Sequence, residues 1–258
     1  MRTPEPHEGV LGRAVSLVYW ALALEGLLLL TTAPGLVLIA LLTPDASNAP
    51  LLAIALVPVA PALSAAVFAW RARGREHDLA PAQHFWRGYR LNALDVSRWW
   101  LPALAVGTAL AVNLAHLRAV PGGWLLGPLL GLLTLASGLV AGHLLVITSL
   151  YAFRTRDALR LAGWFLVRRP LSTLGLASYA VLAAGVVVVG SDWVLALLGS
   201  VLAAALLRNA APILRDVEAT FTVPIGSVPT GSVPGGSVPT GSVPGGSADG
   251  AAAGVGDA

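Results

Sequence analysis

The chain consists of long apolar stretches separated by short polar segments. A helix needs about 20 apolar residues to cross the roughly 30 Å hydrocarbon core of a bilayer. Six stretches near this length can be placed, at residues 15–42, 51–70, 99–117, 124–151, 171–189 and 193–207. The pattern therefore predicts an all-α fold, a polytopic transmembrane helical bundle over residues 15–215. It has about six spans, with five as the alternative.

The segments on either side of this bundle differ from it in composition. Residues 1–14 form a short N-terminal segment, and residues 216–258 contain two copies of a ten-residue Gly/Ser/Val/Pro/Thr repeat. A repeat of this composition cannot bury enough apolar surface to fold. We therefore expect residues 216–258 to form a disordered tail.

Residues 81–98 show a different pattern from the apolar stretches. Aromatic residues recur at three- and four-residue spacing, and arginines fall on the other flank. This periodicity predicts an amphipathic helix that opens near Pro81 and lies at the headgroup boundary on the inner face. The alternative is that the segment simply begins the third span.

The composition excludes several classes of protein. The chain is 56% hydrophobic and 11% charged, whereas a soluble domain carries about 25% charged residues. A nucleic-acid-binding protein would need a basic face on a folded soluble domain, so we expect no nucleic-acid partner. The chain has no cysteine, which excludes disulfides, thiol catalysis and cysteine metal sites.

The distribution of arginine predicts the orientation in the membrane. All sixteen basic residues are arginine, and fifteen lie before the first span, in alternate gaps, or after the last span. The gaps on the opposite side hold only Arg118. Positive residues near span ends are retained on the cytoplasmic side. Arginine without lysine, beside abundant alanine and glycine, is typical of a GC-rich bacterium. We thus expect a multi-pass protein of the bacterial cytoplasmic membrane with both termini inside.

Glu25 and His143 are ionisable residues that lie deep within predicted spans. Glu25 lies about 18 Å beyond Arg13 along the first span, and His143 lies about 16 Å before Arg154 along the fourth, at 1.5 Å per residue. The two residues thus share a similar depth. If their helices are neighbours, they form an intramembrane polar pair that stabilises the bundle or relays protons. The alternative is that each residue is hydrogen-bonded separately.

The fourth predicted span carries spaced glycines, and the sequence lacks the common catalytic motifs. Two pairs on the fourth span are spaced for close helix approach, within the bundle or in self-association: Gly127 with Gly131, and Gly138 with Gly142. The sequence contains neither a nucleophile elbow nor a P-loop, and it shows no clustered Asp/Glu/His constellation. We expect no enzymatic activity, no cofactor and no metal.

Two short motifs carry a resemblance to a known family. Pro-Ala-Leu-Ser-Ala-Ala at 61–66 closes the second span, and Phe-Trp-Arg-Gly-Tyr-Arg-Leu-Asn follows at 85–92. With this layout the chain resembles, over residues 9–215, the YesL-like family of bacterial integral membrane proteins, a domain of unknown function. Genes of that family tend to lie beside carbohydrate-uptake transporters and glycoside hydrolases.

The resemblance implies a non-enzymatic accessory protein that assists or regulates a carbohydrate-uptake transporter. Its partners would be the lipid bilayer and transporter permease subunits. The expected interaction surface on the inner face comprises Phe85, Trp86, Arg87, Tyr89 and Arg90. The alternative function is an autonomous proton-linked carrier of small solutes, in which Glu25 and His143 line the path.

Overall fold

A computed structural model describes residues 10–43, 45–74, 80–119, 121–189 and 192–221. These residues form helices and short connections, with no strand among them. The α-helices are α1 (Val10–Leu41), α2 (Ala49–Ala55), α3 (Val59–Arg73), α4 (Pro81–Ala115), α5 (Gly127–Leu150), α6 (Thr155–Arg168), α7 (Pro170–Val189), α8 (Asp192–Ala196), α9 (Gly199–Asn209) and α10 (Ala211–Phe221).

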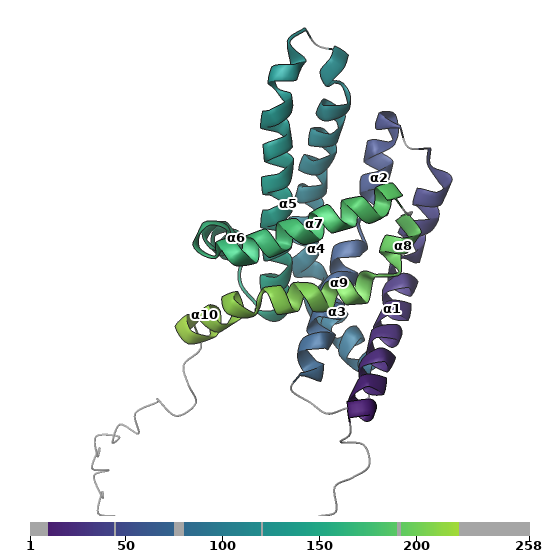
Figure 1. The fold of residues 1–258 in the computed structure, drawn as a ribbon, viewed down its shortest axis with the longest axis vertical. Helices are drawn as coiled ribbons and strands as arrows, with labels where there is room; N and C mark the ends of the chain where they lie inside the picture. Colours follow the sequence, from purple (N-terminus) through teal and green to yellow (C-terminus); the bar gives the residue numbers. More distant parts are fainter. Residues whose placement is uncertain (1–9, 44, 75–79, 120, 190–191, 222–258) are drawn as a thin grey trace, which may run out of the picture.

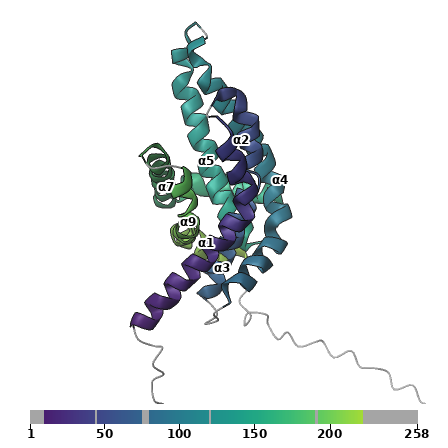
Figure 2. The ribbon, with the colours of Figure 1, turned by 90° about the vertical axis from the view of Figure 1, so that its right-hand side faces the viewer.

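The helices are arranged in two directions. Helices α1 to α5 run lengthwise, and the hairpin of α4 and α5 reaches furthest toward one end (Figure 1). Helices α7 and α9 run across this lengthwise bundle, and a view turned by 90° shows both nearly end-on (Figure 2). Helices α7 and α9 thus form a crosswise layer against the bundle.

Four segments are long and apolar enough to cross a membrane: Leu11–Leu41, Ala46–Arg73, Gly123–Leu150 and Pro170–Val187. Their outward faces carry exposed leucine and valine side chains, such as Leu30, Leu132 and Val181. Contact with lipid accounts for such faces, since a soluble protein rarely exposes large contiguous apolar patches. The predicted class, an all-α membrane-spanning bundle, is confirmed.

The second predicted span is broken into two helices. Pro58 lacks a backbone N–H, and α2 ends at Ala55 before α3 begins at Val59. At this break the Trp100 indole N–H donates to the carbonyl of Leu56 at 3.0 Å. Trp100 of α4 therefore adds a hydrogen bond to the backbone carbonyl of Leu56, between α2 and α3.

The predicted count of six spans is not confirmed. Helix α4, which contains the third predicted span, is not among the four candidate segments. The sixth predicted span is divided between α8 and α9, and the 11 residues of α9 extend only about 16 Å. This is short of the roughly 30 Å of hydrocarbon. The span count stays a prediction.

Residues 81–98 do not form a separate interfacial helix. They are the first half of α4, which continues through the third predicted span to Ala115. The helix is continuous in spite of Pro102 inside it, and the side chains of Phe85, Val96 and Trp99 are all buried. The helix packs lengthwise on α3, where a Cβ at Gly88 would lie only 2.8 Å from that of Phe68. The structure thus makes this segment one continuous helix with residues 99–115, as the alternative interpretation expects.

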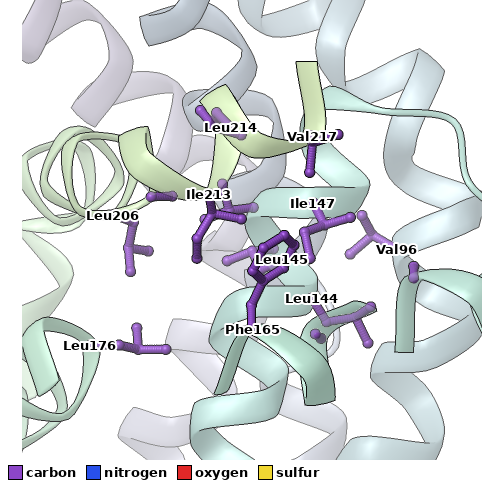
Figure 3. Packing of buried hydrophobic residues seen from close by; sticks show 14 of the residues in the cluster. Val96, Leu144, Leu145, Ile147, Phe165, Leu176, Leu206, Ile213, Leu214 and Val217 are labelled. Carbon is purple, nitrogen blue, oxygen red and sulfur yellow. The ribbon is translucent and has the colours of Figure 1, made fainter. Parts of the chain in front are cut away.

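Two clusters of buried side chains hold the fold together. One joins α1, α3, α4 and α9 around Trp20, Leu24 and Phe85. The other joins α4, α5 and the crosswise helices, and Figure 3 shows Ile147 and Phe165 at its centre. A bidentate ion pair from Arg169 to Asp216, with donor–acceptor distances of 2.6 and 2.7 Å, also fixes α10. The crosswise helices are thus part of the core.

The ends of the chain differ from the expected boundaries. Helix α1 begins at Val10, within the predicted N-terminal segment. Helix α10 extends to Phe221 and buries Val217, so residues 216–221 are helical rather than part of a disordered tail. Residues 1–9 and the repeats of the predicted tail, at 222–258, lie outside the described residues.

The α1–α2 contact generates a stability prediction. A Cβ at Gly35 would overlap the backbone carbonyl of Ala55, whereas a Cβ at Gly26 meets no atom within 4 Å. We expect Gly35→Ala to destabilise the protein by about 1–3 kcal/mol through overpacking. Gly26→Ala, the control on the same helix, should be neutral or slightly stabilising. Thermal unfolding of the purified protein in detergent measures both, and equal midpoints for the two variants would contradict the contact.

Candidate functional site

Glu25 is a buried carboxylate on α1 that contacts the start of α9. One carboxylate oxygen accepts a hydrogen bond from the backbone N–H of Ser200 at 2.7 Å, and the other accepts from Gly199 at 3.3 Å. The side chain is 8% exposed. Glu25 therefore takes the place of a helix cap, supplied by a different helix.

The start of α9 suits this contact in two ways. The first N–H groups of a helix have no partner within the helix, and the helix dipole favours negative charge there. Gly199 also permits the approach, since a Cβ at this position would lie 3.2 Å from the Leu28 side chain and 3.4 Å from the Glu25 carboxylate. Glu25 thus accepts hydrogen bonds from the backbone amides at the start of α9.

Further contacts extend this junction to α3 and α4. The Ser200 hydroxyl donates to the carbonyl of Ala21 at 2.9 Å, and the Trp70 indole N–H donates to the carbonyl of Ser200 at 3.0 Å. Trp20 packs on Trp70 and stacks on His84, with ring centroids 6.4 and 5.9 Å apart. We call Glu25, Ser200, Trp70 and Trp20 the α1–α9 junction.

His143, the other intramembrane residue, lies elsewhere. Its buried ring contacts the Thr173 hydroxyl at 3.2 Å, which links α5 to α7. Each of the two residues has its own partner on another helix: Glu25 on α9 and His143 on α7. The alternative of two separately satisfied residues describes the structure, and no proton relay joins the two directly.

The expected interaction surface divides into buried and exposed residues. Phe85 is fully buried and packs beside Tyr89, which is partly buried. Trp86 is 39% exposed, and Arg87 and Arg90 are exposed. We call these three exposed residues the α4 end surface, since they lie near the helix start at the lower end of the bundle in Figure 1.

The glycine pairs of α5 have different surroundings. A Cβ at Gly142 would lie 2.6 Å from a methyl group of Leu176, so this glycine lets α7 approach α5. Added Cβ atoms at Gly131 and Gly138 would meet nothing within 4 Å, and one at Gly127 would meet only Leu117. Only Gly142 of the four therefore mediates helix packing within the described chain.

Metal-binding chemistry finds no support in the part of the chain that the structure describes. No group of three or more His, Cys, Asp or Glu side chains there could hold a metal ion. The polar residues instead join helices, as Asn92 and Asn209 do by donating to the carbonyls of Ser149 and Ser172. Sequence reasoning missed these contacts and the role of Ser200, whose only sequence signal is a Gly-Ser pair within an apolar stretch.

The architecture described so far is that of an α-helical integral membrane protein whose buried polar side chains connect helices. Residues 15–114 match the model of a family described as "Protein of unknown function, DUF624". The match covers most of α1, all of α2 and α3 and almost all of α4, and it includes Glu25 and the α4 end surface. The YesL-like resemblance is compatible with it. No curated protein and no solved structure matches the chain.

The α1–α9 junction predicts a graded loss of stability. Glu25→Ala would leave two backbone N–H groups without an acceptor, at a cost of about 1–3 kcal/mol each. Glu25→Gln keeps one acceptor oxygen and should cost less. Asn113→Ala is the control, since this exposed side chain bonds only to its own helix. The midpoint of thermal unfolding in detergent should be highest for the control, lower for Glu25→Gln and lowest for Glu25→Ala. A Glu25→Ala protein as stable as wild type would contradict the capping role.

Proposed function

We propose that the protein is a non-enzymatic membrane accessory protein that binds another membrane protein through the α4 end surface. The proposed partner is a permease subunit of a carbohydrate-uptake transporter, which the family resemblance implies. The observation that carries the proposal is an exposed tryptophan beside two exposed arginines on one helix. Trp and Arg are the residue types most enriched among those that dominate binding at protein interfaces.

The rigidity of this surface supports a binding role. The Trp86 ring packs edge-on against Phe85 and Tyr89, with centroids 5.8 and 5.7 Å apart. Since Phe85 is fully buried, Trp86 is held by the core and loses little conformational freedom on binding. A preorganised aromatic anchor of this kind suits a protein partner.

The uses of the buried polar residues favour association over transport. Glu25 accepts two backbone hydrogen bonds, and His143 contacts Thr173. A proton-linked carrier would need Glu25 to release and rebind a proton during each cycle, and each release or uptake would change the contact with α9. The autonomous carrier therefore remains the second hypothesis.

The proposed location is the bacterial cytoplasmic membrane, with the α4 end surface on the inner side. The excess of arginine at this end of the bundle supports this orientation. A partner's cytoplasmic loops would then be within reach of Trp86.

The orientation predicts which positions can be labelled from outside. The native chain has no cysteine, so a single introduced cysteine reports its own side of the membrane. In intact cells, a membrane-impermeant maleimide should label Ala119→Cys, at the hairpin end, and not Gly74→Cys, at the end of α3. Both positions are exposed, and labelling of both after permeabilisation is the control. The reverse pattern in intact cells would refute the orientation.

The proposed partner predicts a specific loss of association. We expect carbohydrate-transporter permease subunits to co-purify with the protein after gentle detergent extraction. Trp86→Ala, and separately Arg87→Ala with Arg90→Ala, should lower their recovery about tenfold, the usual effect of removing an anchor residue. Quantitative mass spectrometry of the co-purified proteins measures the change.

Two exposed positions provide matched controls for this experiment. Leu94→Ala removes an exposed apolar side chain from the same helix, and Arg208→Ala removes an exposed arginine from α9. Both should leave permease recovery unchanged. If Trp86→Ala recovered as much permease as wild type does, the proposed surface would be refuted. Proton-dependent solute uptake by the purified protein in liposomes, abolished by Glu25→Gln, would favour the carrier.

A further inference from the structure

Helix α6 has an exposed face that the proposed function does not use. It lies at the left edge of the molecule in Figure 1 and buries Ala158, Ala162 and Phe165 against the bundle. The rest of its circumference is exposed or only partly covered. This helix, rather than residues 81–98, is the amphipathic helix that stands apart from the lengthwise bundle.

The exposed side of α6 carries two adjacent stripes. One stripe has four-residue spacing and is basic, with Arg156, Arg160, Trp164 and Arg168. The other is apolar and consists of Leu159, Gly163 and Val167. Residues four apart lie on the same face of a helix, so each stripe is continuous.

The stripes meet at an open concavity. It has a volume of about 600 Å³ and is lined by Gly163, Trp164, Val167 and Arg168. The guanidinium carbon of Arg168 lies 5.4 Å from the centroid of the Trp164 ring. Val167 is 81% exposed, and Gly163 has no atom within 4 Å of an added Cβ. The concavity thus combines positive charge, an aromatic ring and uncovered apolar surface.

We propose that this face of α6 lies in the headgroup layer and binds an anionic phospholipid. The lipid phosphate would accept hydrogen bonds from the arginines, and an acyl chain would cover Val167 and the apolar stripe. The charge balance favours an anion, since Asp157 is the only acidic residue of α6. Arg169 is excluded from the site because it is paired with Asp216.

The adjoining helix supports a lipid as the occupant. Helix α7 begins immediately after α6, is long and apolar, and runs across the lengthwise helices (Figure 1). Its Leu171 and Leu174 side chains are exposed and continue the apolar surface. Amphipathic helices with arginine on the polar face and tryptophan at the apolar edge are typical of the membrane interface. The surface therefore faces lipid on one side and headgroups on the other.

Native mass spectrometry of the full-length protein tests the proposal. Phosphatidylglycerol and phosphatidylcholine with identical acyl chains are added in equal amounts to delipidated protein. Wild type should retain phosphatidylglycerol preferentially. The triple variant Arg156→Gln, Arg160→Gln, Arg168→Gln should lose this preference, by about fivefold for each arginine removed. The corresponding triple Lys variant keeps the charge and should keep most of the preference.

A matched triple variant separates the site from the net charge. Arg13→Gln, Arg208→Gln and Arg215→Gln remove three exposed arginines elsewhere and should leave the preference unchanged. Trp164→Ala should weaken retention of both lipids without a change of charge.

Three results would overturn the proposal. In the first, the α6 Gln variant keeps the preference. In the second, the Lys variant or the matched control loses as much of the preference for phosphatidylglycerol as the Gln variant does. In the third, water-soluble glycerol phosphate displaces phosphatidylglycerol at equal concentration, because the site would then recognise a free phosphate ester.

Discussion

The contact between Glu25 and the start of α9 determines how the C-terminal part of the chain can pack. A helix that begins inside an apolar bundle has N–H groups that water cannot reach, and each unsatisfied group costs several kcal/mol in hydrocarbon. The carboxylate supplies acceptors for two of them. Because the acceptors belong to α1, α9 is satisfied only where it crosses α1. The position of α9 therefore depends in part on one side chain of the first helix.

The same constraint explains where the other polar side chains lie. The Trp100 indole donates to the Leu56 carbonyl at the break before Pro58, and Asn209 donates to the Ser172 carbonyl in the first turn of α7. In each case a side chain from one helix supplies a hydrogen bond to the backbone of another. In a bundle built in this way, these polar side chains hold helices together. Its capacity for recognition is then left to the exposed surfaces.

The fold class can be predicted from the sequence, but the arrangement of the helices in space cannot. Apolar length alone identifies α1, α5 and α7 as long apolar helices, because burial in lipid requires such length, but it does not show that α7 runs across the bundle. It failed for the final segment, since a short crosswise helix and a short span have the same apolar pattern. Glu25 was recognised as costly in a membrane, yet its partner Ser200 could not be, because a backbone N–H leaves no trace in residue type. The amphipathic pattern at 81–98 was real but reflected packing on α3.

The two exposed arginine surfaces differ in a way that matches their proposed partners. At the α4 end surface the single aromatic, Trp86, packs edge-on against the buried Phe85, and two exposed arginines lie beside it. On α6 the arginines instead border an uncovered apolar stripe beside a concavity. A tryptophan held by the core suits a protein surface with a complementary pocket. An apolar stripe beside charge requires a partner that is itself amphipathic and fluid, which is the property of a phospholipid. In the two proposals the same residue type would thus serve two kinds of recognition, because its apolar neighbours differ.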